Sequence, residues 1–377
     1  MKIAQVVAYP LSFRLAQGVS LGLGRTIKRD TVVVKVVTED GVVGWGESHH
    51  GRAPGAVAHL INTTLRELVL GMDSREIIKV WSRIYRMQIS SHGLGTATAM
   101  AMSGIDTALW DIKAKMANVP LYQLLGGSSS NIEAYAGGVS LGFKPPEELV
   151  DEVRPLIEMG YRAIKLRVGD NVADDLRRVQ AVRKAIGDNL TILVDANTAY
   201  TPADVRKVMP VFEALNVGWL EEPFAPADAY NYALAKSLGR VPLAAGENHY
   251  TRYDFTKMIE ERSITILQPD VSKTGGVTEI MRIAAMASGW KIPINPHTCT
   301  TSLNMAATIH VLASIDNAGY FEADVAIENP FRTEMTSPAY ELNAEGCVTP
   351  PQKPGLGVEV DEKFIASHAL IDGSCFV

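Results

Sequence analysis

Three acidic residues follow short apolar runs at equal intervals along the chain. Asp195, Glu221 and Glu247 are separated by 26 residues each, and an amide, Asn197, stands two positions after the first of them. Because a strand turns alternate side chains to one face, Asp195 and Asn197 would point the same way from the carboxyl end of a strand. This spacing predicts one repeated strand-containing unit whose acids gather in a single site.

The ligand types at these positions indicate which metal such a site would hold. All three residues are carboxylates, and no cluster of Cys or His accompanies them. Oxygen-only ligands favour a hard cation, with Mg²⁺ preferred to Ca²⁺ or Mn²⁺. The alternative is three unrelated acids near loop starts, which would leave the equal steps unexplained.

Short apolar runs alternate with amphipathic helical stretches from residue 132 onward. Strands are expected to begin near Glu133, Ala163, Thr191, Gly218, Pro242, Thr265, Lys291 and Gly319. Alternating strands and helices imply a parallel sheet, and eight such units with polar carboxyl ends imply a closed (β/α)8-type TIM barrel. An open doubly wound sheet should carry a G-x-G-x-x-G loop after its first strand, and residues 136–142 lack that spacing.

The residues before the barrel follow a different pattern. Residues 1–50 resemble strands with a turn at Glu39–Gly41, and helical spacing of apolar residues follows up to about residue 116. We therefore predict an α+β domain over 1–126, the barrel over 127–325, and a C-terminal segment, 326–377, that packs back on the first domain.

The composition limits the classes of partner. Of 377 residues, 47% are hydrophobic and 21% charged, which is ordinary for a soluble protein with a sizeable core. The net charge of −6 argues against nucleic acid or an anionic membrane as the main partner. Neither a signal peptide nor a membrane span is expected, because no apolar run approaches 18 residues. Three scattered cysteines, Cys299, Cys347 and Cys375, indicate a reducing compartment, so we expect a cytoplasmic protein.

Further chemistry-bearing residues fall at the ends of the other predicted strands. Lys165 and Arg167 share one face of the second strand and require anions, either a substrate carboxylate or the metal-binding acids. Asp270 and His297 end the sixth and seventh strands, so a carboxylate would orient an imidazole and make it a better base. Glu322 lies on the eighth strand.

These groups together favour one class of reaction. A substrate carboxylate bound near a dication has an acidified α-proton, because the charge of the forming enolate is stabilised by the cation and the nearby ammonium. The site is therefore expected to abstract a proton α to a carboxylate. Cys299 lacks a predicted basic partner and is interpreted as a small residue of the rim.

The chain resembles the mandelate racemase subgroup of the enolase superfamily. The resemblance rests on Lys165-x-Arg167, Asp195-x-Asn197, Glu221-Glu-Pro, Gly246-Glu247-Asn, Asp270, His297, the segment Gly104–Asp111 and Pro354–Gly357. It implies a modified (β/α)7β barrel with an N-terminal capping domain. It also implies Mg²⁺ ligation by Asp195, Glu221 and Glu247, with Glu222 as a neighbour that does not ligate. His297 paired with Asp270 would be an acid/base, and Glu322 would hydrogen-bond the substrate carboxylate. We also expect a homo-oligomer.

One position departs from the family pattern. The second base is usually the second lysine of a Lys-x-Lys pair, and here that residue is Arg167, a poor proton acceptor at neutral pH. This difference fits dehydration of an acid sugar, run largely by His297, better than two-base racemisation.

The resemblance leaves several alternatives open. An epimerase or a sugar-lactone cycloisomerase would use the same enolate, and a barrel that binds metal and ligand without turnover is a rival of another class. The glycine-bearing loops at residues 15–25 and 49–55 correspond to the capping loops that select the substrate. Their polar candidates for substrate binding are Arg25, His49, His50 and Arg52, together with Asn197 of the barrel.

Overall fold

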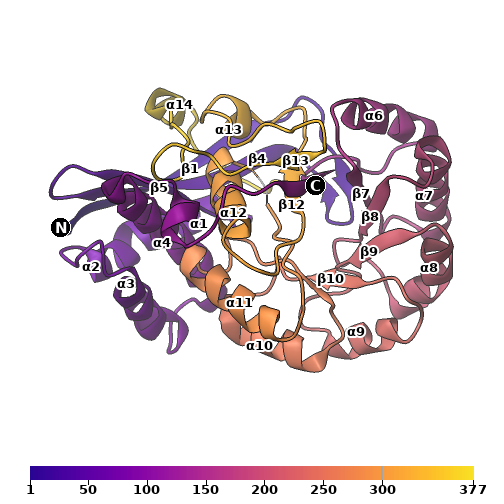
Figure 1. The fold of residues 1–377 in the computed structure, drawn as a ribbon, viewed down its shortest axis with the longest axis horizontal. Coiled ribbons are helices and arrows are strands. Elements are labelled where there is room, and N and C mark those ends of the chain that lie inside the picture. The colour runs from indigo at the N-terminus through magenta and orange to yellow at the C-terminus, as the bar shows by residue number, and fades with distance from the viewer. Residues whose placement is uncertain (299) are drawn as a thin grey trace.

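The computed structural model describes residues 1–298 and 300–377, so Cys299 lies outside the described residues. Figure 1 shows an antiparallel sheet with its helices on one side and a ring of strands and helices on the other. The antiparallel sheet has the order β1 (Ile3–Arg14), β4 (Lys28–Thr38), β5 (Val43–Ser48). A small hairpin, β2 (Ser20–Leu21) with β3 (Gly24–Arg25), extends from the chain between β1 and β4.

The long helix α4 lies directly against strand β5. It spans Gly95–Ala117 within a helical set that also contains α1 (Pro54–Leu60), α2 (Arg66–Val69), α3 (Ile77–Ile84), α5 (Leu121–Leu124) and two π-helical turns, Ile61–Leu65 and Tyr85–Ile89. A side chain at Gly46 would place its Cβ 2.2 Å from the carbonyl oxygen of Gly104. Glycine at this strand position therefore allows the close helix–sheet approach, as an α+β domain requires.

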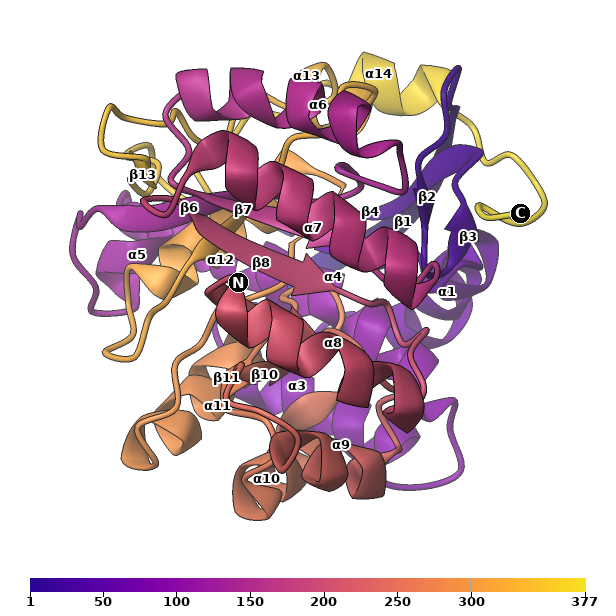
Figure 2. The ribbon, with the colours of Figure 1, turned by 90° about the vertical axis from the view of Figure 1, so that its right-hand side faces the viewer.

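The second part of the chain forms the predicted barrel. Its strands are β6 (Ile132–Gly137), β7 (Ala163–Arg167), β8 (Thr191–Asp195), β9 (Val217–Glu221), β10 (Leu243–Ala245), β11 (Ile266–Leu267) and β12 (Phe321–Asp324). The helices between them are α6 (Pro146–Glu158), α7 (Val172–Ile186), α8 (Pro202–Ala214), α9 (Ala229–Lys236), α10 (Thr251–Glu261), α11 (Val277–Gly289) and α12 (Ser302–Leu312). Figure 2 shows α6 to α9 in succession over the outer face of the strands.

The seventh strand is much shorter than the sequence predicts. Where a strand from Lys291 was expected, Ile294 alone forms parallel bridges, one to Leu267 and one to Ala318. Pro293 has no N–H to donate to a ladder, which limits pairing on this side. The single bridged residue still closes the ring, since β12 also pairs with β6. The predicted barrel is therefore confirmed, in its (β/α)7β form.

Aromatic side chains fill the amino-terminal half of the barrel interior. Tyr135, Trp219 and Tyr320 pack edge to face with ring centroids 5.5 to 6.1 Å apart. Lys165 lies next to this cluster, with its ammonium 5.5 Å from the centre of the Tyr135 ring. The apolar plug thus separates the amino end of the barrel from the charged carboxyl-end rim.

The C-terminal segment returns to the antiparallel domain. It contains α13 (Pro330–Thr333), β13 (Cys347–Val348) and α14 (Glu362–Ser367). Asp111 of α4 accepts the N–H of Leu356 at 2.8 Å, and the N–H of Leu121 donates to Gly355. Gly355 has φ +80°, and a Cβ there would lie 2.2 Å from the Asp111 carboxylate. The Pro354–Gly357 motif therefore joins the segment to α4, whereas the limits predicted at 126 and 325 stay a prediction.

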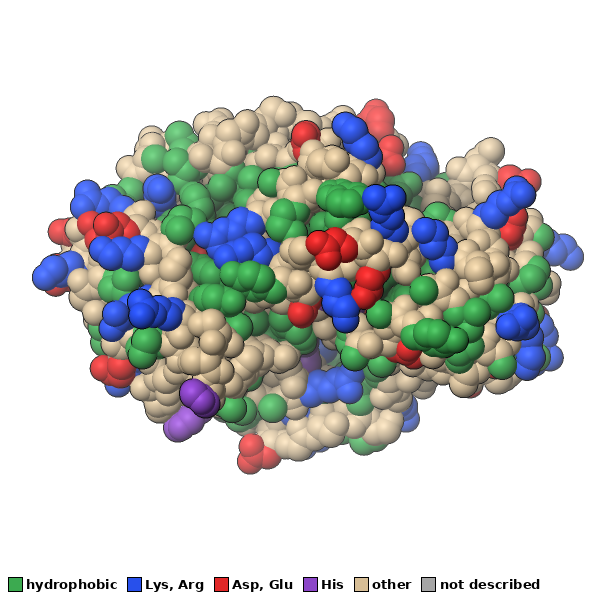
Figure 3. All heavy atoms as spheres, turned by 90° about the horizontal axis from the view of Figure 1, so that it is seen from below, with side chains coloured by type: hydrophobic (Ala, Val, Ile, Leu, Met, Phe, Trp, Pro, Cys, Tyr) green, Lys and Arg blue, Asp and Glu red, His purple; other side chains and the backbone are tan. Residues whose placement is uncertain are grey.

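The surface and the helices carry two further observations. In Figure 3, acidic and basic side chains are interspersed over the face in view, with apolar side chains between them. Within residues 1–298 and 300–377, no helix combines the length and the apolar character that crossing a bilayer requires. Cys347 and Cys375 are both free thiols.

A buried carboxyl group joins the two parts and gives a test of the fold. Glu47 of β5 accepts hydrogen bonds from Thr31 of β4 and from Thr301, which caps α12 of the barrel. Burial raises the pKa of Glu47 from its usual 4.5 to about 8, although both hydrogen bonds favour the ionised form. The folded protein therefore keeps this proton at pH values where the unfolded chain has lost it.

We predict that Glu47 lowers the free energy of unfolding as pH rises from 4.5 through 8. One proton bound only by the folded state changes stability by about 1.4 kcal/mol per pH unit. Glu47→Gln removes this titration, so urea denaturation of the variant across this range should show a flatter pH dependence than wild type. The exposed Glu67→Gln variant is the control. Equal slopes for the Glu47 variant and wild type would contradict the assignment.

Candidate active site

A cavity of about 330 Å³ lies between the N-terminal domain and the carboxyl-end rim of the barrel. Its wall comprises Leu21, Leu23, His49, His50, Gly51, Arg52, Met100, Val139, Arg167, Asn197, Glu247, Asn248, Tyr250, Lys273, His297 and Phe376. Residues from both parts of the chain therefore enclose one space, and the barrel rim supplies its charged side.

The Lys165 ammonium is buried beneath this cavity among three carboxylates. Its Nζ lies 2.8 Å from Glu221, 2.9 Å from Glu322 and 3.5 Å from Asp195. Burial disfavours the charge, but Glu221 and Glu322 outweigh that effect and raise the pKa of Lys165 well above its usual value. The ammonium is therefore charged, and it joins the ends of β8, β9 and β12 to β7.

The register of the strands brings the first two acids together. Arg167, Asp195 and Glu221 are opposite one another on β7, β8 and β9, and Glu221 pairs with Ala244 of β10, just before Glu247. Trp219 and Gln268 donate to the same oxygen of Glu221, at 3.1 and 2.8 Å. The equal spacing in the sequence thus corresponds to three successive strand ends of one rim.

Arg167 is bound tightly within this rim. Its guanidinium donates to Asp195, to the carbonyl of Gly138 and, at 3.2 Å, to Asn197. Burial opposes the charge, but Asp195 and the other acids of the rim raise the pKa of Arg167 further. The structure thus gives this side chain the features of a permanent cation and none of those of a base.

Asp270 and His297 form a hydrogen-bonded pair. His297 Nδ1 lies 2.6 Å from Asp270, and Nε2 lies 2.8 Å from Glu247 on the cavity side. Asp270 also accepts from the backbone and hydroxyl groups of Ser272 and from Asn304. Burial alone would lower the pKa of His297, but Glu247 and Asp270 outweigh it and raise that pKa. Asp270 is thus fixed in place and sets the ring so that Nε2 faces the cavity.

The donor set suits a hard divalent cation. Asp195, Glu221 and Glu247 offer carboxylate oxygens only, the ligand type that Mg²⁺ prefers. Burial, together with Asp195 and Glu322, raises the pKa of Glu221 to about 7 despite Lys165, which marks a local excess of negative charge. A cation would remove this excess. The residues present therefore fit the ion that the sequence predicts.

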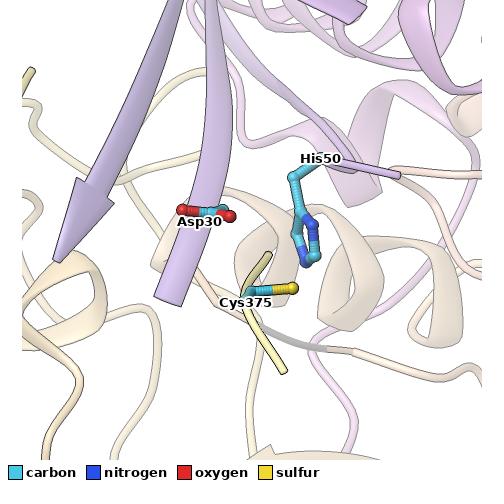
Figure 4. Close-up of side chains that lie close together, drawn as sticks. All are labelled: Asp30, His50 and Cys375. Atoms are coloured by element: carbon cyan, nitrogen blue, oxygen red, sulfur yellow. The ribbon is translucent and has the colours of Figure 1, made fainter. Parts of the chain in front are cut away.

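A tighter group of possible ligands lies elsewhere but does not suit a cation. Among the described residues, Asp30, His50 and Cys375 alone have ligand atoms all within 4.8 Å of one another (Figure 4). His50 Nδ1 accepts the N–H of Arg52, which leaves the proton of the neutral ring on Nε2, and Lys28 already lies 3.2 Å from Asp30. The carboxylate oxygens of Asp195, Glu221 and Glu247 are more widely spread, because each acid is paired with a different basic side chain. The partners are Arg167, Lys165 and His297, respectively.

Glu222 differs from its neighbour Glu221. It is buried, one carboxyl oxygen accepts from Asn248 at 2.8 Å, and the other has no hydrogen-bond partner among the described residues. Burial and the nearby Glu247 raise the pKa of Glu222 well above its usual value. A neutral carboxyl group fits the expectation that this residue stands beside the ligands without being one.

The predicted capping-loop residues are placed unequally. His49, His50 and Arg52 line the cavity, and so does Asn197. Arg25 does not: its side chain is exposed, and its backbone N–H and carbonyl pair with Val377. The structure therefore does not bring Arg25 into the wall, because the hairpin uses this residue to hold the end of the chain.

Lys273 and Phe376 are among the wall residues that were not predicted from the sequence. Lys273 lies three positions after Asp270, and its buried ammonium is 3.8 Å from Glu247. Phe376 comes from the opposite end of the chain, where it bridges to Thr26. Position in the loop after the sixth strand was a signal available for Lys273, whereas nothing local in the sequence indicates the placement of Phe376.

Comparison with protein families matches both parts of the chain. Residues 5–126 match the mandelate racemase/muconate lactonizing enzyme N-terminal domain, and residues 148–364 match the enolase C-terminal domain-like family. The chain belongs to the enolase superfamily, in its mandelate racemase subgroup. The resemblance seen in the sequence is thus confirmed, as is the capped barrel.

Members of the superfamily with different reactions are similar to this chain. Arabinonate dehydratase of Saccharolobus solfataricus is 34% identical over 88% of each chain. A 3,6-anhydro-α-L-galactonate cycloisomerase of Streptomyces coelicolor is 32% identical over 96% of each chain. Dehydration and cycloisomerisation therefore both occur among its relatives.

Solved structures of the superfamily superpose along the whole chain. A superfamily member from Polaromonas sp. JS666 is 52% identical, with a TM-score of 0.98 and full coverage of both chains. A racemase from Streptomyces coelicolor with bound magnesium is 29% identical, with a TM-score of 0.90 over 98% of this chain and 100% of that one. The barrel and its cap are thus shared with a magnesium-bound protein.

We predict that Lys165→Met lowers the free energy of unfolding by about 3–5 kcal/mol, because it leaves buried carboxylates without their counter-ion. Urea denaturation in the presence of a chelator measures this loss without interference from bound metal. The matched control is Lys144→Met, which breaks the more exposed pair of Lys144 with Glu152 and should cost at most about 1 kcal/mol. Similar losses for the two variants would show that the buried cluster does not organise the rim.

Proposed function

We propose that this protein is a Mg²⁺-dependent dehydratase of an acid sugar, an aldonate or aldarate. It would remove the proton α to the carboxylate and expel the β-hydroxyl, giving a 2-keto-3-deoxy acid. The observation that carries the proposal is the Asp270–His297 pair. Nε2 of His297 faces the cavity next to Glu247, one of the three carboxylates that suit a metal ion.

Positive charge held by three carboxylates of the rim would make the α-proton acidic enough to remove. Asp195, Glu221 and Glu247 would hold the ion, which supplies positive charge beside the substrate carboxylate. Lys165 adds a fixed ammonium, which lies against the carboxylates of Glu221 and Glu322. Positive charge at this position would stabilise the negative charge that develops as the enolate forms.

His297 is the proposed base and acid. Although burial opposes it, Glu247 and Asp270 raise the pKa of His297, so the base is the deprotonated fraction of the ring, whose Nε2 takes the α-proton. The Asp270 carboxylate accepts the hydrogen bond of Nδ1–H and stabilises the resulting imidazolium. The imidazolium then protonates the departing β-hydroxyl, which leaves as water. The enol product becomes the 2-keto acid when C3 takes a proton. One residue thus serves both proton transfers.

For Glu322 we propose a role other than the one that the resemblance implies. It accepts from Lys165 at 2.9 Å, from the N–H of Gly138 at 3.0 Å and from the N–H of Thr298 at 3.2 Å. Burial disfavours its charge, but Lys165 and His297 outweigh that effect and lower the pKa of Glu322 to about 2. An ionised carboxylate cannot donate to a substrate carboxylate, so we propose that Glu322 positions Lys165.

Arg167 supports elimination over racemisation. Racemisation requires a second base on the opposite face of the α-carbon, and the residue at that position is a guanidinium bonded to Asp195. The second candidate function is a sugar-lactone cycloisomerase, which the similar D-galactarolactone cycloisomerase of Agrobacterium fabrum favours. Mass spectrometry of the product separates the two, since dehydration removes one water from an open-chain acid, whereas cycloisomerisation gives an isomer of its cyclic substrate.

We predict that activity and thermal stability both depend on a divalent cation. Chelator-treated protein should lose turnover and melt at a lower temperature, and Mg²⁺ should restore both, because ligand binding to the folded state stabilises it. Glu247→Gln should abolish the Mg²⁺-induced rise in melting temperature, and the exposed Glu260→Gln should retain it. Full turnover in chelated, metal-free protein would overturn this part of the proposal.

We predict that His297→Asn abolishes dehydration and solvent-deuterium exchange at the α-carbon, because the amide cannot accept a proton. The loss should be at least about 10²–10⁴-fold, the usual contribution of a general acid–base group. Asp270→Asn should retain the fold and lose most activity. The assay follows 2-keto acid formation over a library of acid sugars, with the exposed His92→Asn as control. Turnover of His297→Asn within tenfold of wild type would identify another base.

A further inference from the structure

Two cations in the cavity wall, Lys273 and Arg52, make no hydrogen bond to a carboxylate of the described residues. Lys273 is buried in the loop after β11, and its nearest acid among the described residues is Glu247, at 3.8 Å, beyond hydrogen-bond distance. Glu247 already lies 2.8 Å from His297 and accepts from Asn248. The Lys273 ammonium therefore lies beside the reaction centre with its hydrogen-bonding capacity unused by a carboxylate.

Arg52 is the second cation of the wall, and unlike Lys273 it is exposed. It lies in the loop before α1, and its guanidinium stacks over the ring of Phe376 at 5.2 Å. No carboxylate in the described chain lies within 4.0 Å of it. The aromatic ring holds the guanidinium at the cavity wall without neutralising its charge.

The two histidines between these cations add donors and no negative charge. The rings of His49 and His50 stack at 4.2 Å, and their Nδ1 atoms accept the N–H groups of Gly51 and Arg52. Burial, then Lys273 and Arg52, lower the pKa of His50 to about 3, so the ring is neutral. Lys273, Arg52 and His50 all line the same cavity.

The other charged side chains of the site are paired with one another, with one ammonium, Lys165, shared by two carboxylates. Arg167 is paired with Asp195, Lys165 with Glu221 and Glu322, and Asp270 with His297. A divalent ion would take up the charge left on the three ligand acids. The substrate's reacting carboxylate then faces a wall that still carries the positive charges of Lys273 and Arg52.

We propose that the substrate is a dicarboxylate, an aldarate, whose second carboxylate is the counter-ion of Lys273 and Arg52. This inference rests on the proposed function and narrows it, because an aldonate ends in an uncharged hydroxymethyl group. An aldonate in the same cavity would bury the Lys273 ammonium against a hydroxyl, whereas an aldarate pairs the charge.

The test compares acids that differ only at the far end of the chain. D-Glucarate with D-gluconate, and galactarate with D-galactonate, differ by a carboxylate in place of a hydroxymethyl group. Losing one partner of a desolvated charge pair reduces binding by roughly 30-fold or more. We expect kcat/KM for the active aldarate to exceed that of its aldonate by at least this factor. Equal values for the pair would overturn the inference and leave the dehydratase proposal intact.

A binding measurement separates this inference from the proposed reaction. Adipate and 6-hydroxyhexanoate have six carbons and no stereocentres, and calorimetry in the presence of Mg²⁺ gives their affinities without turnover. We expect adipate to bind more tightly by the same factor. If no acid sugar is converted but adipate is preferred, the reaction is misassigned and the charge inference stands. Equal affinities would overturn the inference whatever the reaction.

Variants of Arg52 and Lys273 test whether these residues cause the preference for a dicarboxylate. Arg52→Gln should raise KM for the aldarate and reduce the adipate preference, whereas Arg206→Gln, on the exposed face of α8, should change neither. Lys273→Met should do the same as Arg52→Gln, and the Mg²⁺-induced rise in melting temperature reports whether the metal site survives in that variant. An undiminished adipate preference in both variants would exclude these residues as the counter-ions.

Discussion

The buried ammonium of Lys165 is the interaction on which the rest of the site depends. Three carboxylates can lie within a few ångströms of one another in a protein interior only if positive charge is distributed among them, since an unpaired buried charge is costly. Lys165 provides that charge at 2.8 Å from Glu221 and 2.9 Å from Glu322. It reaches these acids because β7 lies beside β8 at the same rim, above an aromatic plug that excludes water from below.

A division of roles follows from these contacts. Lys165 and Arg167 are held as permanent cations by the acids around them, so neither is suited to exchange protons during a reaction. His297 is the side chain that has one nitrogen fixed by Asp270 and the other directed at the cavity. In the proposed reaction, the charges of the rim would stabilise an enolate and His297 would carry out both proton transfers.

The sequence predicts the rim well because strand ends follow simple rules. Period-two alternation and equal spacing place Asp195, Glu221 and Glu247 at successive strand ends, and parallel pairing then brings Asp270 to within 2.6 Å of His297. The short seventh strand was not anticipated. Pro293 weakens pairing only if its position in the ladder requires an N–H donor, and the sequence alone does not show this.

The capping side of the cavity is less predictable. Loop residues are placed by contacts that are distant in sequence, as when Arg25 pairs with Val377 and Arg52 stacks on Phe376. No periodicity encodes such pairings, so Arg25 was expected in the wall and Phe376 was not. Lys273 was missed for a different reason: a lysine in a loop is usually solvated, and its burial follows from the cap that covers it.

The central claim is that one base on a rim organised by Lys165 carries out an elimination. The most direct measurement is NMR of an acid-sugar reaction run in D₂O to half conversion. The account predicts a 2-keto acid with one deuterium at C3, and recovered substrate with no deuterated α-epimer. Exchange of the α-proton of both epimers with solvent at similar rates would show a second base at work and would contradict it.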